Sequence, residues 1–399
     1  MSLTMLCLAS YHKGFEFLRE AKRQGARVLL VTSASLRDAD WPRDSIDDIF
    51  YVQDDKKRWK LDDLILGASH LARKVPIDRI VPLDDFDLEK ASALREHLRV
   101  PGMGETTMRH FRDKLAMRVK AQDDGLPVPA FVHVLNEQRI SEFCQQVPPP
   151  WFLKPRRQAG AIGIRKIQSE AELNEATEAL GDERSNFLLE EYVAGEVCHV
   201  DSIVYERQVL AAVPSKYGTP PFDVSHSGGV FTTRLMDRDA PETAELLALN
   251  ERLLASLGLV RGVSHSEYIR GRDGRFVFLE TSARVGGAHI ADLVEAATGV
   301  NMWAEWAKIE VAGGKAPYTV PPMRTDYAGL IVSLARQESP DLSAYTDPEI
   351  VWRLEKPNHA GLIVRSTNRK RVDELLARYS ESFQQDFVAT LPAALTPYD

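Results

Sequence analysis

The chain has 399 residues, of which 44% are hydrophobic and 27% are charged, and its formal net charge is -8. This length predicts two or three domains. The charges are of mixed sign without a basic run, which argues against a nucleic-acid or anionic-membrane partner. No run of 18 or more apolar residues occurs, so no membrane span is expected. Cys7, Cys144 and Cys198 lack CxxC spacing, which indicates reduced thiols in a cytoplasmic protein rather than disulfides or a zinc site.

The first 105 residues alternate short apolar runs with helical patterns. Strands are predicted at residues 5–9, 28–32, 49–52 and 80–83, and helices at residues 14–25 and 61–74. This alternation indicates a parallel sheet with crossover helices, so residues 1–105 are expected to form a Rossmann-like α/β domain. Ligands bind such sheets at the carboxyl ends of the strands, where residues 10–13 and 84–87 lie. Ordinary loops are the alternative for both segments.

The next part of the chain predicts a helical connector followed by a small unit. A helix is expected over residues 107–123, and the connector, residues 106–150, ends in three consecutive prolines. Residues 151–194 are expected to form a small α+β lid. Its predicted elements are strands at 151–154, 164–167 and 187–193, a glycine loop at 160–163 and a helix at 170–180.

The remaining sequence predicts further strands and a long helix. Residues 197–213 and 276–281 are rich in Val, Ile and Phe, as central strands are, and they are separated by a predicted helix at 242–257. We assign residues 195–325 to a central domain and residues 326–399 to a C-terminal α+β segment. That segment contains two similar strands, at 328–333 and 360–365, and a helix at 372–379. Because the similar sequence occurs only twice, a solenoid of repeats is not predicted.

The most informative cluster is a pair of acidic residues on two predicted strands. Glu267 ends one strand, Glu280 ends the next, and residues 272–274 (Arg-Asp-Gly) provide a turn between them. The two carboxylates can therefore face each other across a hairpin. Burying two carboxylates together is costly unless a cation joins them, and Mg²⁺ prefers such hard oxygen ligands. Arg284 would add donors for a phosphoryl group, whereas a Glu267–Arg284 salt bridge in a plain hairpin is the alternative.

Two further clusters suit a nucleotide. Lys154 ends a strand before a glycine loop, and this arrangement can present an ammonium and backbone N–H groups to a polyphosphate. The loop has neither Walker A nor dinucleotide-fingerprint spacing, and a surface turn is the alternative. Residues 188–196 run from a strand into a glycine turn with acidic groups, which is typical of a nucleoside pocket but also of an exposed edge strand.

Together these clusters resemble the ATP-grasp superfamily, in particular carboxylate-amine ligases of the amino-acid-ligase and biotin-carboxylase-like branch. The resemblance runs from about residue 101 to residue 287. It implies an ATP-grasp fold with α/β and α+β parts: the N-terminal Rossmann-like domain, a small mobile lid and a central and C-terminal antiparallel-sheet domain. The implied activity is an ADP-forming ligation of a carboxylate to an amine through an acyl phosphate, with small-molecule substrates. ATP and one or two Mg²⁺ ions are the implied cofactors, Mn²⁺ is a substitute, and a homodimer is compatible with the resemblance.

The resemblance also implies roles for particular residues. Lys114 and Lys154 would contact the ATP phosphates, and Glu267 and Glu280 would bind magnesium. Arg284 would stabilise phosphoryl transfer. The nucleotide-binding set is completed by the lid residues Gly160, Ala161 and Gly163 and by the nucleoside residues Glu190, Glu191, Val193 and Glu196. Within that last group, main-chain atoms of Glu191 and Val193 would contact adenine, and the Glu196 carboxylate would contact the ribose.

One position departs from the family pattern. The usual Glu-x-Asn-x-Arg reads Glu-Thr-Ser-Ala-Arg here, so Ser282 would replace an amide as a metal ligand, and the number of ions stays open. For substrates, a loop over residues 216–229 with His226 is expected to cover the acceptor pocket, bordered by Gly287; a plain surface loop is the alternative. A small-molecule kinase and a non-catalytic nucleotide-binding protein are the competing functions, and the identities of acid and amine remain open.

Overall fold

The computed structural model describes residues 2–55 and 58–389, and its N-terminal domain contains a four-stranded parallel sheet. The strand order is β3-β2-β1-β4, and every neighbouring pair is parallel. The strands are β1 (Thr4–Ala9), β2 (Arg27–Ser33), β3 (Asp48–Val52) and β4 (Arg79–Pro82), and the helices are α1 (Phe15–Arg23), α2 (Leu61–Ala72) and α3 (Leu88–Leu98). Alternate residues of β1 enter two separate hydrophobic cores, so both faces of this sheet are covered. The predicted strands and helices of this domain are confirmed.

The prediction of one continuous helix over residues 107–123 is wrong, because the helix is interrupted in the middle. The chain forms α4 (Glu105–Met108), a 3-10 turn and then α5 (Lys114–Asp123). The Asp113 carboxylate accepts hydrogen bonds from the backbone N–H groups of Leu115 and Ala116, which caps a new helix. Lys114 is therefore the first residue of α5 and not part of a helix interior.

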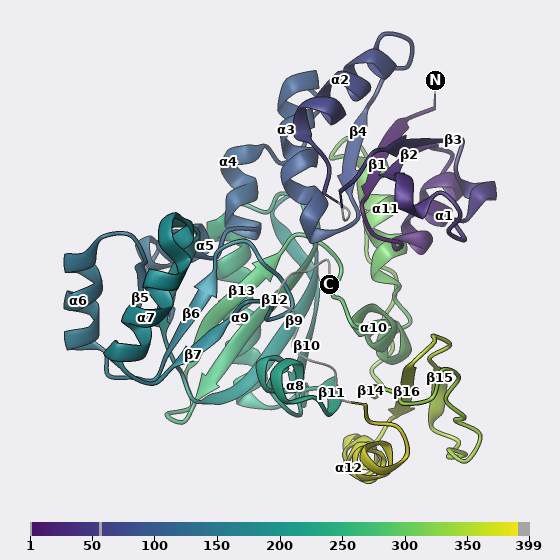
Figure 1. The fold of residues 1–399 in the computed structure, drawn as a ribbon. Coiled ribbons are helices and arrows are strands. Elements are labelled where there is room, and N and C mark those ends of the chain that lie inside the picture. The colour runs from purple at the N-terminus through teal and green to yellow at the C-terminus, as the bar shows by residue number, and fades with distance from the viewer. Residues whose placement is uncertain (1, 56–57, 390–399) are drawn as a thin grey trace.

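The small unit is a four-stranded antiparallel sheet of order β5-β8-β6-β7. Its elements are β5 (Phe131–His133), α6 (Glu137–Gln146), β6 (Trp151–Pro155), β7 (Arg165–Ile167), α7 (Glu170–Leu180) and β8 (Phe187–Glu191). The segment expected to be a helical connector thus supplies β5 and α6. The physical reason is pairing: Phe131–His133 is too short to read as a strand in the sequence, but β8 offers it a free edge. Figure 1 places this unit at one end of the molecule, away from the N-terminal sheet.

The large sheet has eight strands in the order β13-β12-β9-β10-β11-β14-β16-β15 and is antiparallel throughout. Its strands are β9 (Gly195–Tyr205), β10 (Gln208–Tyr217), β11 (Val230–Leu235), β12 (Gly262–Gly271), β13 (Phe276–Ser282), β14 (Tyr327–Leu334), β15 (Ile350–Arg353) and β16 (His359–Ser366). The helices are α8 (Pro221–Ser227), α9 (Pro241–Leu257), α10 (Ile290–Thr298), α11 (Met302–Ala312) and α12 (Arg369–Asp386). The two similar sequences become neighbours, since β14 pairs with β16.

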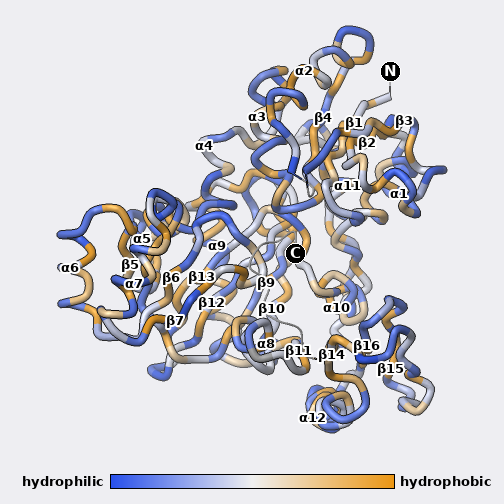
Figure 2. Tube along the Cα trace, in the orientation of Figure 1, coloured by the Kyte–Doolittle hydropathy of each residue, from blue (hydrophilic) through white to orange (hydrophobic). Residues whose placement is uncertain are grey.

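Apolar packing joins the three parts. Phe17 of α1 packs edge-on against Trp306 of α11, with ring centroids 5.2 Å apart, and this contact fixes the N-terminal domain to the helices beside the large sheet. Figure 2 shows hydrophobic residues along the strands of the N-terminal sheet and more hydrophilic residues in the surrounding loops. Among the described residues, no helix combines the length and the apolarity that crossing a bilayer requires. Asp85, just after β4, accepts hydrogen bonds from Ser282 and Arg284. The carboxyl ends of the parallel strands β1 and β4 thus face toward the end of the β12–β13 hairpin that carries these two residues.

Candidate nucleotide and metal site

A cavity of about 330 Å³ lies between the small sheet and the large sheet. Strands β9, β12 and β13 form one wall, while β6, the glycine loop and α8 form the other. Nine of the residues singled out from the sequence line it: Lys114, Lys154, Gly160, Ala161, Val193, Glu267, Glu280, Arg284 and Gly287. Six do not: Gly163, Glu190, Glu191, Glu196, His226 and Ser282.

The predicted hairpin of glutamates is present. Glu267 on β12 and Glu280 on β13 are direct cross-strand partners, and a β-bulge follows Glu267. Glu280 Oε2 lies 2.8 Å from Lys114 Nζ, and Glu267 Oε1 accepts a hydrogen bond from the Tyr217 hydroxyl at 2.7 Å. Two carboxylates on one wall of a cavity form a hard-oxygen donor set. These residues therefore fit a divalent cation of the Mg²⁺ type.

Lys154 is held by a buried ion-pair cluster beneath the cavity. Its Nζ lies 2.6 Å from Glu190 Oε2, and Arg118 Nη2 lies 2.6 Å from the other oxygen of the same carboxylate. Burial would raise the pKa of Glu190, but Arg118 and Lys154 hold it below its usual value. Burial lowers the pKa of Lys154 against the opposing effect of Glu190. Glu190 is fully buried, so its place in the structure is that of a counterion for Lys154 and not of a nucleoside ligand.

The glycine loop joins β6 to β7 with unusual backbone angles. Gly160, Ala161 and Gly163 all have positive φ, at 68°, 62° and 72°. A Cβ at position 163 would lie 3.0 Å from the Pro155 side chain, so this glycine turns the loop back over its strand. Lys114 Nζ donates to the Gln158 carbonyl at 2.5 Å, and this bond links the loop to α5.

The predicted nucleoside residues separate onto different surfaces. Val193 lines the cavity, but the Glu191 carboxylate accepts from the Ala130 N–H at 3.2 Å, and the Glu191 N–H donates to the Ala130 carbonyl at 2.8 Å. Glu196 pairs with Lys216 and lines a separate groove. Side chains alternate along a strand. Because Gly195 and Val197 face the cavity, Glu196 faces the opposite side of β9.

Asp85, at the carboxyl end of β4, organises the other end of the cavity. It accepts hydrogen bonds from the Ser282 hydroxyl and from Arg284, whose Nε lies 2.7 Å from Asp85 Oδ2. Burial would raise the pKa of Asp85, but Arg284 and Arg112 hold it well below its usual range. Ser282 is therefore directed to a carboxylate and is not free as a metal ligand. A substrate-site role for residues 84–87 stays a prediction: Asp85 does not line the cavity itself but pairs with Arg284, which does.

Residues 216–229 do not form the single loop that was predicted. Tyr217 ends β10, and α8 occupies Pro221–Ser227. His226 is exposed on α8, with Nε2 3.2 Å from the Ile164 carbonyl. Phe222 of α8 packs against Phe152 of β6 with ring centroids 4.8 Å apart. This helix thus touches the small sheet and the glycine loop, and its Phe222, not its His226, lines the cavity.

A buried polar network behind Glu267 was missed from the sequence. It comprises His199, Asp201, Tyr217 and His265. Burial would lower the pKa of His265, but Asp201 raises it to about 10. Burial would raise the pKa of Glu267, but His265 holds it below its usual value. The signal was present in the spacing, because His265 and Glu267 are two residues apart on one strand and so share a face.

The comparisons with known proteins agree with this geometry. Residues 147–292 match the ATP-grasp domain family, so the chain contains an ATP-grasp domain. An L-arginine-specific L-amino acid ligase of Bacillus subtilis is 25% identical over 243 residues, which are 59% of this chain and 58% of that protein. The chain therefore spans little more than half the length of that relative.

Two solved structures extend the likeness to the whole fold. An L-amino acid ligase from Bacillus licheniformis has a TM-score of 0.72 at 16% identity, covering 97% of this chain and 98% of that chain. A carboxyaminoimidazole ribonucleotide synthase from Aspergillus clavatus, complexed with ATP, has a TM-score of 0.73 at 13% identity, covering 96% and 99% of the two chains. The predicted ATP-grasp fold, with its parallel and antiparallel sheets, is confirmed.

Proposed function

We propose that this protein is an ADP-forming carboxylate-amine ligase that uses ATP and Mg²⁺. The observation that carries the proposal is the pair Glu267 and Glu280, placed opposite each other on one wall of a cavity that Lys114, Lys154 and Arg284 also line. The matched B. subtilis relative is a ligase of amino acids, and one similar solved structure is an ATP complex. Both support ATP-dependent ligation over the competing functions.

The chemistry consists of two linked transfers. A carboxylate oxygen attacks the γ-phosphorus of ATP, the bond to the β-phosphate oxygen breaks, and ADP leaves. An amine then attacks the acyl carbon, loses a proton and expels phosphate. Phosphoryl transfer depends mainly on positioning and on neutralising charge at the equatorial oxygens.

The side chains divide that work according to where they lie. Lys114 and Lys154 would hold the phosphates, and the Arg284 guanidinium would neutralise the transferred group and the acyl phosphate. Mg²⁺, when bound, would supply neutralisation of the phosphate charge. Glu267 and Glu280 would hold it, with Mn²⁺ as a substitute, and because Ser282 is directed to Asp85 we favour one tightly held ion.

We further propose that the substrates are amino acids or peptide-like molecules. Arg284 lines the cavity close to where the N-terminal domain meets it, and its guanidinium is available to the carboxylate of such a molecule. The mobile part is the glycine loop with the small sheet, which would close over the triphosphate and keep water from the acyl phosphate. Free cysteines, two of them buried, suit a reducing cytoplasm.

ADP release across a panel of acids and amines tests the proposal. The unaltered protein should release ADP only when a suitable acid is present, and hydroxylamine should convert that acid to a hydroxamate. The Glu280→Gln variant is the control, since it keeps shape but removes one metal carboxylate. ADP formation with a stable phosphate ester and no hydroxamate would establish a kinase, and the absence of ADP formation with every acid would establish a binding module.

A further inference from the structure

We propose that Asp201, acting through His265, and Tyr217 fix one carboxylate oxygen of Glu267, so that Glu267 offers only its other oxygen to the cation. Asp201 and His265 are thus positioning residues for a metal ligand. The inference rests on the proposed function, because it needs Glu267 to bind the ion. It adds residues that the ATP-grasp resemblance did not single out.

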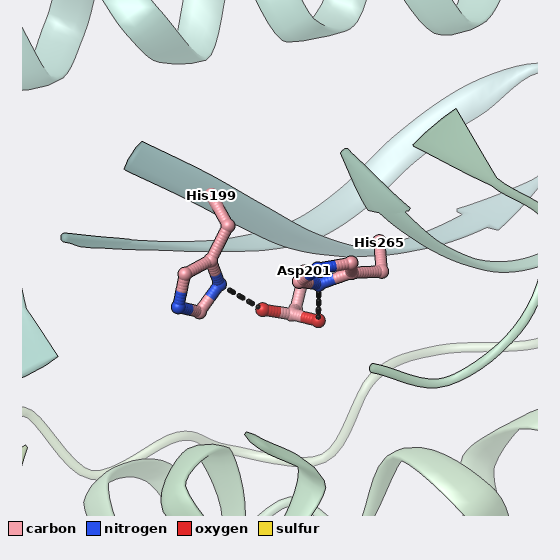
Figure 3. A group of neighbouring side chains, drawn as sticks. All are labelled: His199, Asp201 and His265. Carbon is pink, nitrogen blue, oxygen red and sulfur yellow. Dashed lines mark hydrogen bonds and ion pairs between the residues drawn. The ribbon is translucent and has the colours of Figure 1, made fainter. Parts of the chain in front are cut away.

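The network begins at the Asp201 carboxylate, which bridges two histidines (Figure 3). His199 Nδ1 lies 2.8 Å from Asp201 Oδ2, and His265 Nδ1 lies 2.9 Å from Asp201 Oδ1. His199 Nε2 in turn lies 2.8 Å from the Thr233 hydroxyl. All four residues are buried, so these hydrogen bonds do not compete with bulk water.

The network ends on one oxygen of Glu267. The Tyr217 hydroxyl donates to Glu267 Oε1 at 2.7 Å, and His265 Nε2 lies 3.6 Å from the same atom. The Tyr217 hydroxyl also lies 3.5 Å from His265 Nε2. The Glu267 side chain is 13% exposed, and within residues 2–55 and 58–389 no hydrogen bond or ion pair reaches its Oε2. One oxygen therefore accepts a hydrogen bond from Tyr217 and lies beside the His265 imidazole, and the other remains available to the cavity.

An alternative use of the same residues is a metal ion held by His199, Asp201 and His265, whose ligand atoms all lie within 4.8 Å of one another. The packing disfavours it. Both imidazole Nδ1 atoms are already bonded to carboxylate oxygens, and a Cβ at Gly286 would lie 2.8 Å from Asp201 Oδ1 and 3.1 Å from His265 Nδ1. Backbone therefore fills the space beside the ligand atoms where an ion would need to enter.

The structure also explains why the network bears on catalysis. Gly286 follows Arg284 by two residues and packs directly on Asp201 and His265. The same buried cluster thus supports both the metal carboxylate and the loop that carries the guanidinium. Loss of residues that orient a metal ligand costs about 10–100-fold in metal affinity or activity in other proteins.

The test is a Mn²⁺ titration of the full-length protein with saturating ADP, followed by electron paramagnetic resonance of free Mn²⁺. The Asp201→Asn variant should bind Mn²⁺ about 10–100-fold more weakly, and Tyr217→Phe should weaken binding in the same direction. ADP affinity in the presence of a chelator should be unchanged in both. In steady-state assays the Mg²⁺ concentration for half-maximal rate should rise by a similar factor, while KM for ATP at saturating Mg²⁺ stays constant.

Tyr268→Phe is the matched control. Tyr268 is the next residue on β12, is fully buried, and donates a hydrogen bond to Asn250 Oδ1 at 2.9 Å on the opposite face of the strand. The Tyr268→Phe variant loses the same kind of hydrogen bond as Tyr217→Phe. If the effect were a general loss of sheet stability, both variants would therefore bind Mn²⁺ equally weakly.

The outcomes separate this inference from the proposed function. If Glu267→Gln abolishes Mn²⁺ binding while Asp201→Asn and Tyr217→Phe bind like the unaltered protein, the positioning role is refuted and the metal site stands. Equal weakening by Tyr268→Phe also refutes it. If Glu267→Gln keeps full affinity, or if Mn²⁺ binding survives Glu267→Gln but not Asp201→Asn, both the inference and the metal assignment fail.

Discussion

The buried cluster beneath Lys154 allows a prediction with a definite magnitude. In Glu190→Gln, the guanidinium of Arg118 and the ammonium of Lys154 lose their shared counterion inside the small sheet. Arg118 and Glu190 are fully buried, and Lys154 is 5% exposed. Removing one partner from a buried ion pair costs about 3–5 kcal/mol, because the remaining charge stays desolvated. Since about 1.4 kcal/mol corresponds to a tenfold change, the small sheet should open on the order of 10²- to 4 × 10³-fold more often.

Hydrogen exchange of the backbone amides in β6 and β8 measures this opening directly. These two strands pair along Trp151–Pro155 and contain both Lys154 and Glu190. Glu191→Gln is the matched control. Glu191 is the next residue on β8 and is less buried, and its carboxylate accepts a hydrogen bond from the Ala130 N–H. That change should cost about 0.5–1 kcal/mol. Unchanged exchange in Glu190→Gln together with a loss of ADP affinity would return Glu190 to the role of a nucleotide ligand and refute the counterion argument.

Three further predictions concern the cavity and its support. Arg284→Lys keeps the charge beside Asp85 but loses the planar fork of donors, so kcat for ADP release should fall about 10²–10³-fold. Burial and the nearby Asp84 raise the pKa of Asp87 to about 6, so the charged form of Asp87 destabilises the fold as pH rises through about 6. Urea titrations at pH 8 should therefore show that Asp87→Asn is more stable than the unaltered protein by about 1–3 kcal/mol. At pH 4 the two proteins should have similar stability. A Cβ at Gly195 would lie 2.1 Å from the Arg270 carbonyl, and so Gly195→Ala should lower the thermal midpoint, with a cost of about 1–3 kcal/mol.

Each of these predictions has a result that would contradict it or a matched control. For Asp87→Asn, the Ser10 N–H that donates to Asp87 at 2.9 Å can still donate to the amide oxygen, so a loss of stability at pH 8 would contradict the burial argument. For Gly195→Ala, the helical Gly67 has no atom within 4 Å of an added Cβ, and Gly67→Ala should be neutral or slightly stabilising. An Arg284→Lys variant with an unaltered kcat would exclude a bidentate contact to the transferred group.

The sequence predicted the fold best where local pattern and tertiary structure agree. The strand and helix alternation of residues 1–105 and the Glu267–Glu280 hairpin both appear in the structure. The prediction failed where the determinant was non-local. Strand β5 has three residues and becomes a strand only by pairing with residues of β8 that lie 55 to 59 positions later. The break before Lys114 was local, and the Asp113 cap could have been found from its side-chain type.

The site residues divide along the same line. Lysines and glutamates were identified by order and spacing, but a carboxylate in a strand can face either side, and a one-residue difference decides which. Glu190 and Glu196 read as nucleotide ligands, yet one enters a buried ion-pair cluster and the other the opposite face of β9. Asp85 reaches Ser282 across 197 positions, a contact that no local pattern indicates.

Activation of a carboxylate by phosphoryl transfer can be followed with an oxygen isotope. The protein is incubated with ATP, an amine and an acid labelled with ¹⁸O in both carboxylate oxygens, and the released phosphate is analysed by mass spectrometry. We expect one ¹⁸O atom in each phosphate, because the attacking carboxylate oxygen leaves with the phosphoryl group. Phosphate free of ¹⁸O, released while the amide forms, would contradict an acyl phosphate and the function built on it.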